Sequence, residues 1–156
     1  MPVGSPSVQT RASKKYQEKV GLISKSYKLK KELVERFAEA CDKKGKKICN
    51  SNLVGYDQNQ RNTLHTAFKK YKYNASKYIK SGEKSETDCS AFMTVLAIVA
   101  GVVELEYTGN APTTSTMVDA FVETGKFKKK KYKKGMTLKP GYILVKEGSH
   151  TVMYLG

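Results

Sequence analysis

Cysteine is scarce in this chain of 156 residues. The three cysteines, Cys41, Cys49 and Cys89, form an odd set without paired C-x-x-C spacing, so they cannot make a zinc site of the usual form. No other metal or cofactor is implied. So few cysteines also fit a reducing compartment. A disulfide between Cys41 and Cys49 is an alternative that would leave Cys89 free.

Long hydrophobic segments are also lacking. The longest apolar run, Ala91 to Val103, is interrupted by Thr94 and Gly101 and is too short to span a bilayer, so it is predicted to form a core helix. Met1 to Lys15 contains Pro, Gly, Ser, Thr and basic residues without an apolar core. We therefore expect a flexible basic arm there, and neither a signal peptide nor a membrane anchor.

Acidic residues are few as well. The 14 Asp and Glu stand against 29 Lys and Arg, which gives a net charge of +15. A surface this positive favours polyanionic partners such as nucleic acid, an anionic membrane, or a cell wall that carries teichoic acids. Charge alone does not choose among them. With 39% hydrophobic residues, the chain can bury one ordinary core and carry a small appendage.

The residues from Thr87 to Gly101 predict a buried helix with a thiol in its first turn. Thr87 or Asp88 can cap the free N–H groups at the start of the helix, and Gly101 suits the left-handed position after its end. Cys89 would then lie at the positive end of the helix dipole, which stabilises a thiolate and favours a nucleophile. The alternative is a buried cysteine that serves only packing.

A β-hairpin is predicted near the end of the chain. The runs 138–145 and 150–155 are rich in β-formers and are separated by a Gly-containing turn, so His150 would open the second strand. A histidine there can become a neighbour of Cys89 once the helix packs on the sheet, and its imidazole can accept the thiol proton. Alone, a histidine on a strand serves structure more often than catalysis.

Three segments together carry a family resemblance: Gly55–Arg61, Glu86–Ser90 and Gly148–Val152. They resemble the catalytic domains of phage and bacterial cysteine peptidoglycan hydrolases, the NlpC/P60-like and CHAP-like group with a papain-like core. The likeness covers about residues 48 to 156. It implies an α+β fold in which a Cys-bearing helix packs on a small antiparallel sheet.

The same resemblance implies an activity. The enzyme would hydrolyse an amide or peptide bond in the stem or cross-bridge of peptidoglycan, with Cys89 as the nucleophile, His150 as the base and Tyr56 as a donor to the oxyanion. A third polar residue that orients the histidine usually follows it on the next strand, and its identity here is open. The expected setting is phage lysis or wall penetration by a protein that is cytoplasmic before lysis or virion-associated. Its partners would be peptidoglycan and anionic wall polymers.

The basic unit at residues 16–47 has a different pattern. Ile23 to Leu29 alternates with period two, which predicts a strand, and Glu32 to Lys44 repeats at helical spacing, with Gly45 ending the helix. This order resembles the first half of a ribbon-helix-helix module, whose strands read the major groove of DNA. An alternative function is therefore a basic DNA-binding or phage structural protein in which the hydrolase-like fold is inactive.

The remaining segments complete the expected organisation. Residues 1–15 form the arm, residues 16–47 the basic strand–helix appendage, and residues 48–156 the hydrolase-like domain, with Lys46 to Asp57 as a polar connector. Two further helices are predicted. One spans Gln58 to Tyr73, with His65 on its solvent side, and the other runs from Ser115 or Thr116 to Thr124. Lys126 to Lys134 should be an exposed strand or loop and is the densest positive patch.

Overall fold

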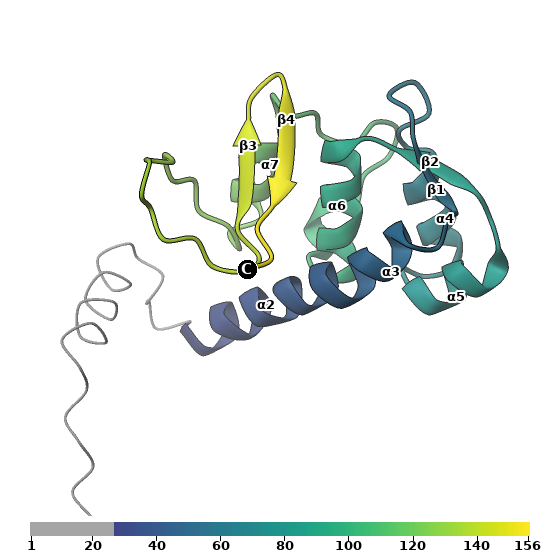
Figure 1. Cartoon of the computed structure of the whole chain (residues 1–156), viewed down its shortest axis with the longest axis horizontal. Coiled ribbons are helices and arrows are strands. Elements are labelled where there is room, and N and C mark those ends of the chain that lie inside the picture. Colours follow the sequence, from purple (N-terminus) through teal and green to yellow (C-terminus); the bar gives the residue numbers. More distant parts are fainter. Residues whose placement is uncertain (1–26) are drawn as a thin grey trace, which may run out of the picture. The chain divides into compact units, whose positions relative to one another are not determined.

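The computed structural model describes residues 27–156, and Figure 1 shows their α+β arrangement. The helical elements are α2 (Tyr27–Glu39), the π-helix η1 (Ala40–Gly45), α3 (Lys46–Cys49), α4 (Thr63–Lys70), α5 (Ala75–Ser81), α6 (Cys89–Val99), the 3₁₀-helix η2 (Val103–Leu105) and α7 (Met117–Glu123). The strands are β1 (Val54–Tyr56), β2 (Ser85–Thr87), β3 (Ile143–Lys146) and β4 (His150–Met153). One compact unit extends from Val34 to Gly156. No helix within residues 27–156 is both long and apolar enough to cross a membrane.

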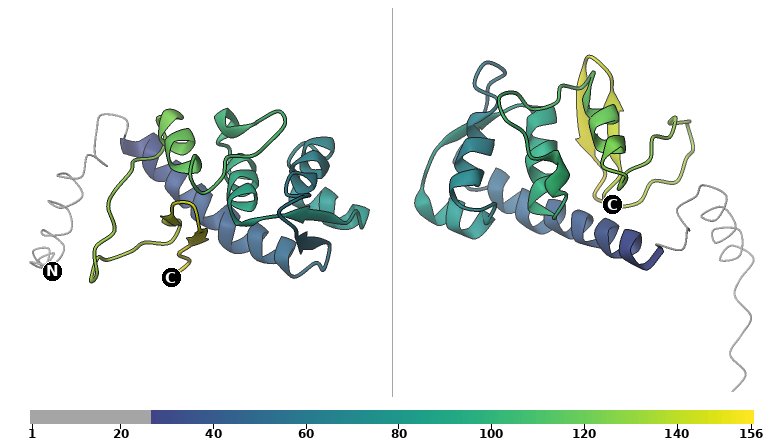
Figure 2. Two further views of the ribbon diagram at one scale, coloured as in Figure 1. Left: turned by 90° about the horizontal axis from the view of Figure 1, so that it is seen from above. Right: turned by 180° about the vertical axis from the view of Figure 1, so that it is seen from behind.

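Helix α6 forms the centre of this unit. Its residues from Met93 to Ile98 are all buried, and the helix packs against α4, η1, η2 and β4. In Figures 1 and 2, α6 lies between the α4–α5 part of the molecule and the β3–β4 hairpin. The predicted core helix is confirmed. It starts at Cys89 after the cap Asp88, and Gly101 follows its end with φ +103°.

Helix α2 begins where the sequence predicted the end of a strand. Tyr27 to Leu29 belong to α2, so the strand expected there is wrong, while Ile23 to Ser26 lie outside the described residues. Alternation over a few residues is weak evidence for a strand when strong helix formers continue the segment. Phe37, Ala40 and Cys41 are buried, as the helical spacing predicted.

Gly45 does not end this run, because the backbone stays helical there and continues as α3 to Cys49. A Cβ at Gly45 would lie 3.4 Å from Leu96 Cδ1, so the glycine allows α6 to pack closely. The connector expected at Lys46 to Asp57 is thus helical at its start, and Ile48 is fully buried. The domain limits at residues 15 and 47 remain predictions.

Two small sheets complete the fold. Strand β1 pairs in parallel with β2, with Gly55 opposite Glu86, and this pairing was not predicted. Strand β3 pairs antiparallel with β4, with Lys146 opposite His150, which confirms the hairpin. Because α6 packs against β4, the expected contact between the Cys-bearing helix and an antiparallel sheet is also present.

Helix α4 is shorter than the predicted helix, and the predicted surface position of His65 in it is wrong. Lys72 and Tyr73 have positive φ and stop the helix, which starts only at Thr63. His65 was expected on the surface, but it is only 6% exposed. The Tyr107 ring stacks on its imidazole at 3.8 Å, and the Tyr73 hydroxyl lies 2.9 Å from Nε2. These aromatic partners cover a position that helical periodicity alone assigns to solvent.

The segment after α6 follows the sequence closely. The short helix expected near Ser115 is α7, and Gly125 follows it with φ +69°. Residues 128–135 are exposed and contain no regular element, as expected for the basic patch. Two ion pairs attach this region to the rest of the unit: Lys126 with Glu104, and Lys129 with Glu147 in the hairpin turn.

Candidate functional site

An open pocket of about 230 Å³ lies at the start of α6. It is lined by Cys49 of α3, Val54, Gly55 and Tyr56 of β1, Thr87 and Asp88, and Cys89 and Phe92 of α6. The parallel pairing of β1 with β2 brings Tyr56 beside Thr87, which precedes Cys89 by two residues. A thiol at a helix start is therefore accessible from solvent through a defined cavity.

Cys89 is the first residue of α6 and is partly exposed. Asp88 caps the helix, because its Oδ1 accepts a hydrogen bond of 2.8 Å from the Ala91 N–H. The first N–H groups of an α-helix have no acceptor within the helix, so they form a local site for negative charge. The predicted position of Cys89 at such a helix start is confirmed.

Tyr56 ends β1 and is 62% exposed. It lines the same pocket as Cys89, although the two residues are far apart in sequence. The fold therefore brings together two of the three residues suggested by the sequence.

His150 is the first residue of β4 and is exposed. It does not line the pocket, and no hydrogen bond joins it to Cys89 within the described part of the chain. Its strand packs against α6, and the turn of the hairpin lies at the same end of the unit as the start of α6 (Figures 1 and 2). The structure thus places the strand that carries His150 beside the helix that carries Cys89, without placing the imidazole in the pocket.

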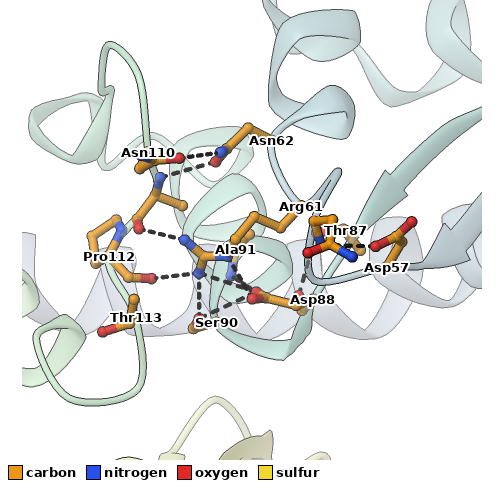
Figure 3. Close-up of polar contacts among 12 residues, drawn as sticks. Asp57, Arg61, Asn62, Thr87, Asp88, Ser90, Ala91, Asn110, Pro112 and Thr113 are labelled. Carbon is orange, nitrogen blue, oxygen red and sulfur yellow. Dashed lines mark hydrogen bonds and ion pairs between the residues drawn. The ribbon is translucent and has the colours of Figure 1, made fainter.

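Arg61 is a residue of this site to which sequence reasoning gave no role. Figure 3 shows its guanidinium between the cap of α6 and the loop at residues 110–113. Nε donates to Asp88 Oδ2 at 2.5 Å, and Nη2 donates to Asp88 Oδ1 at 3.1 Å and to Ser90 Oγ at 2.7 Å. Nη1 donates to the Ala111 carbonyl at 2.6 Å, and Nη2 also to that of Pro112 at 3.0 Å. We call this group of bonds the Arg61 clasp.

The clasp sets the charge state of Asp88. Burial by itself would raise the pKa of the Asp88 carboxyl. Hydrogen bonds from Arg61, from the Ala91 N–H and from Ser90 outweigh burial and hold this pKa below its ordinary value. Asp88 is therefore ionised at neutral pH and paired with a cation, and the two side chains are only 12% and 11% exposed.

Asn62 attaches the same loop beside the clasp. Its Oδ1 accepts from the Ala111 N–H at 2.9 Å, and its Nδ2 donates to Asn110 Oδ1 at 2.8 Å. Both Arg61 and Asn62 thus hold a loop that lies about fifty residues away in the chain. Such pairings cannot be predicted from a short stretch of sequence, because neither the spacing nor the residue types indicate which distant residue is the partner.

The other two cysteines differ from Cys89. All three are free thiols, so the Cys41–Cys49 disulfide is not present. Cys41 is buried, and burial raises the pKa of its thiol to about 12. Cys49 is exposed and lines the pocket, although desolvation raises the pKa of its thiol too. Among residues 27–156, no group of three or more His, Cys, Asp or Glu side chains could hold a metal ion.

A family model for the endolysin-like domain matches residues 23–156. The chain belongs to the endolysin-like domain family. This membership confirms the recognition of a phage endolysin-type protein and indicates a lysis-related function at the cell wall. It does not distinguish the NlpC/P60-like from the CHAP-like class. The chain matches no curated protein and no solved structure.

Proposed function

We propose that this endolysin-like domain is a papain-like cysteine hydrolase of the NlpC/P60 or CHAP class that cleaves an amide or peptide bond of peptidoglycan. The observation that carries the proposal is the position of Cys89. Its thiol lies at the N-terminus of a capped helix and opens into a pocket that it shares with Tyr56. A helix N-terminus stabilises both a thiolate and a developing oxyanion.

In the proposed reaction, Cys89 Sγ attacks the carbonyl carbon of the substrate and its proton passes to the His150 imidazole. Backbone N–H groups in the first turn of α6 and the Tyr56 hydroxyl donate to the oxyanion. The C–N bond then breaks as His150 protonates the leaving nitrogen, and water hydrolyses the thioester to restore the free thiol.

The role of His150 requires that its side chain reach the thiol from the start of β4. The packing of β4 against α6 supports this approach. His150 is exposed at the start of β4, and no other described side chain hydrogen-bonds to it, so the proposed dyad works without an orienting third residue among residues 27–156. A free imidazole samples unproductive poses, which lowers the rate and leaves the fold intact.

The lysine-rich segment Lys126–Lys134 supplies the proposed contact with anionic wall polymers. Its residues 128–134 are exposed, and the segment lies between α7 and the hairpin that carries His150. Retention on cell walls should therefore weaken as the salt concentration rises. In this proposal residues 48–156 form the hydrolase, residues 16–47 form the basic unit and residues 1–15 form an arm.

The test is release of new amino groups from purified Gram-positive cell walls. Wild type should release them, whereas Cys89→Ala and His150→Ala should not. Cys49→Ala is the matched control, because its thiol lines the same pocket without a role in the reaction. Mass spectrometry of the fragments then identifies the bond. Absence of release by folded wild type on several wall types would refute the proposal.

A second candidate is a basic DNA-binding or phage structural protein with an inactive hydrolase-like fold. The position of His150 outside the pocket favours it. An activated Cys89 should be alkylated well below the pH at which an ordinary thiol reacts, whereas a packing cysteine should resist. Salt-dependent retention on DNA that is weakened by Lys25→Gln or Lys28→Gln and not by general loss of charge, together with a resistant Cys89, would favour this second candidate.

A further inference from the structure

The Arg61 clasp reaches both neighbours of the proposed nucleophile. Arg61 donates to Asp88 and to Ser90, the residues before and after Cys89, and it donates to two carbonyl oxygens of a separate loop (Figure 3). We propose that Arg61 is a positioning residue for Cys89 and acts through Asp88 and Ser90. This inference rests on the proposed function, because it takes Cys89 as the nucleophile.

The geometry of the guanidinium supports a positioning role. A planar fork with several fixed N–H directions can hold a carboxylate, a hydroxyl and two carbonyls at once. The Asp88 carboxylate in turn holds the Ala91 N–H, so the clasp fixes the first turn of α6 from both sides of Cys89. A nucleophile displaced by about 1 Å loses about 100-fold in rate. Arg61 thus controls where the sulfur and the first-turn N–H groups point.

The charge of Arg61 supports the same role. The ionised Asp88 directly precedes Cys89, and an unpaired carboxylate there would oppose a thiolate. Arg61 compensates this charge with a side chain that is itself largely buried. Asp88, Tyr56 and Cys49 are the titratable side chains that line the pocket with Cys89, and Arg61 is paired with Asp88. Asp57 lies next to Tyr56 and donates its N–H to the Thr87 carbonyl at 3.0 Å, and His150 starts β4, the strand that packs against α6.

The first experiment replaces the planar guanidinium of Arg61 and keeps its positive charge. Arg61→Lys leaves a single ammonium group, which cannot reach all four acceptors of the clasp. We expect kcat for a soluble wall peptide to fall at least about 30-fold while KM changes less than about threefold. The control is Tyr78→Phe, which removes a buried hydrogen bond of 3.1 Å to Ser85 outside the pocket. This control should keep kcat within about twofold although it lowers the unfolding temperature.

The second experiment separates charge from structure and needs no substrate. Alkylation by iodoacetamide is followed against pH in a Cys49→Ser background, so that Cys89 is the accessible thiol. In Arg61→Gln, the pH at which the alkylation rate is half-maximal should rise by about one unit, because Asp88 then lacks its counter-charge. Adding Asp88→Asn to the same chain should reverse the shift. A merely structural role would not produce this reversal, because the second substitution removes a further partner.

The outcomes for the clasp and for the proposed function differ. Wild type that fails to hydrolyse any wall substrate refutes the proposed function, and the alkylation profile still tests Arg61. Active wild type combined with an undiminished kcat in Arg61→Lys overturns the inference. An alkylation profile that does not move in Arg61→Gln overturns it as well.

Discussion

The two halves of the proposed dyad lie in very different surroundings. Cys89 starts a helix whose cap is held by the buried Arg61 clasp, and it opens into a pocket with Tyr56. His150 is exposed at the start of β4, the strand that follows the hairpin turn, and described side chains make no hydrogen bond to it. Several hydrogen bonds and an ion pair therefore fix the nucleophile side, whereas no described side chain orients the imidazole on the base side. Substitutions on the nucleophile side should therefore lower the free energy of unfolding much more than substitutions at His150. Substitutions on either side should abolish activity.

The largest expected effect comes from removing the clasp. Arg61→Met leaves the buried Asp88 carboxylate without its cation, which should lower the free energy of unfolding by about 3 to 5 kcal/mol. Urea denaturation followed by circular dichroism would measure this change. A loss below about 1 kcal/mol would show that Asp88 is readily solvated and that the first turn of α6 is not held by Arg61.

Acid should weaken the same side of the molecule. The folded pKa of Asp88 is held below its unfolded value of about 3.9, so its contribution is complete above that pH and disappears as the pH falls through the folded pKa. Asp88→Asn should therefore cost about 1 to 3 kcal/mol at pH 7, and this difference should shrink steadily below about pH 4. Parallel urea titrations of both proteins from pH 7 to pH 2 would show it. A difference that is constant over this range would contradict the assignment.

A smaller effect is expected from His65. Burial, assisted by Lys69, lowers the pKa of His65 in the folded protein, so the unfolded chain binds more protons below its pKa of about 6.5. Stability should fall as the pH drops from about 6.5 toward the folded pKa and then level off. His65→Gln should remove this dependence. The Lys69→Gln variant is a useful companion, because it should reduce the slope without removing it.

The smallest effect on stability should come from the base side. His150→Ala removes an exposed side chain without a described partner, so the free energy of unfolding should change by less than about 0.5 kcal/mol. Wall hydrolysis should nevertheless be lost in this variant. A destabilisation similar to that of Arg61→Met would mean that His150 has a structural role, and the contrast between the two halves would then fail.

Local patterns predicted the elements that depend on neighbouring residues. The cap Asp88, the apolar run of α6 and the following Gly101 lie within one short segment, so capping and periodicity identified this helix and its thiol. The hairpin was equally readable, because two β-rich runs flank one turn. The strand expected at Tyr27 to Leu29 failed where alternation competed with strong helix formers.

Long-range contacts escaped prediction for a common reason. Strand β1 pairs with β2 in parallel across two helices, and three-residue strands have too little pattern to reveal a partner. The burial of His65 depends on Tyr107, which comes from the loop after η2. Arg61 stood within a segment that carried the family resemblance, yet its ligands Asp88, Ser90, Ala111 and Pro112 are 27 to 51 residues away.

The sequence by itself determined the kind of chemistry that this endolysin-like domain can offer: a thiol at a helix start, a histidine at a strand start, and a strongly basic surface. These features follow from residue types and from interactions over a few positions, which operate in any fold. Only the tertiary structure decided which groups meet. It placed Tyr56 with Cys89 in one pocket, kept His150 at the surface, and enclosed Arg61 with Asp88, because contacts between distant segments depend on how the whole core packs.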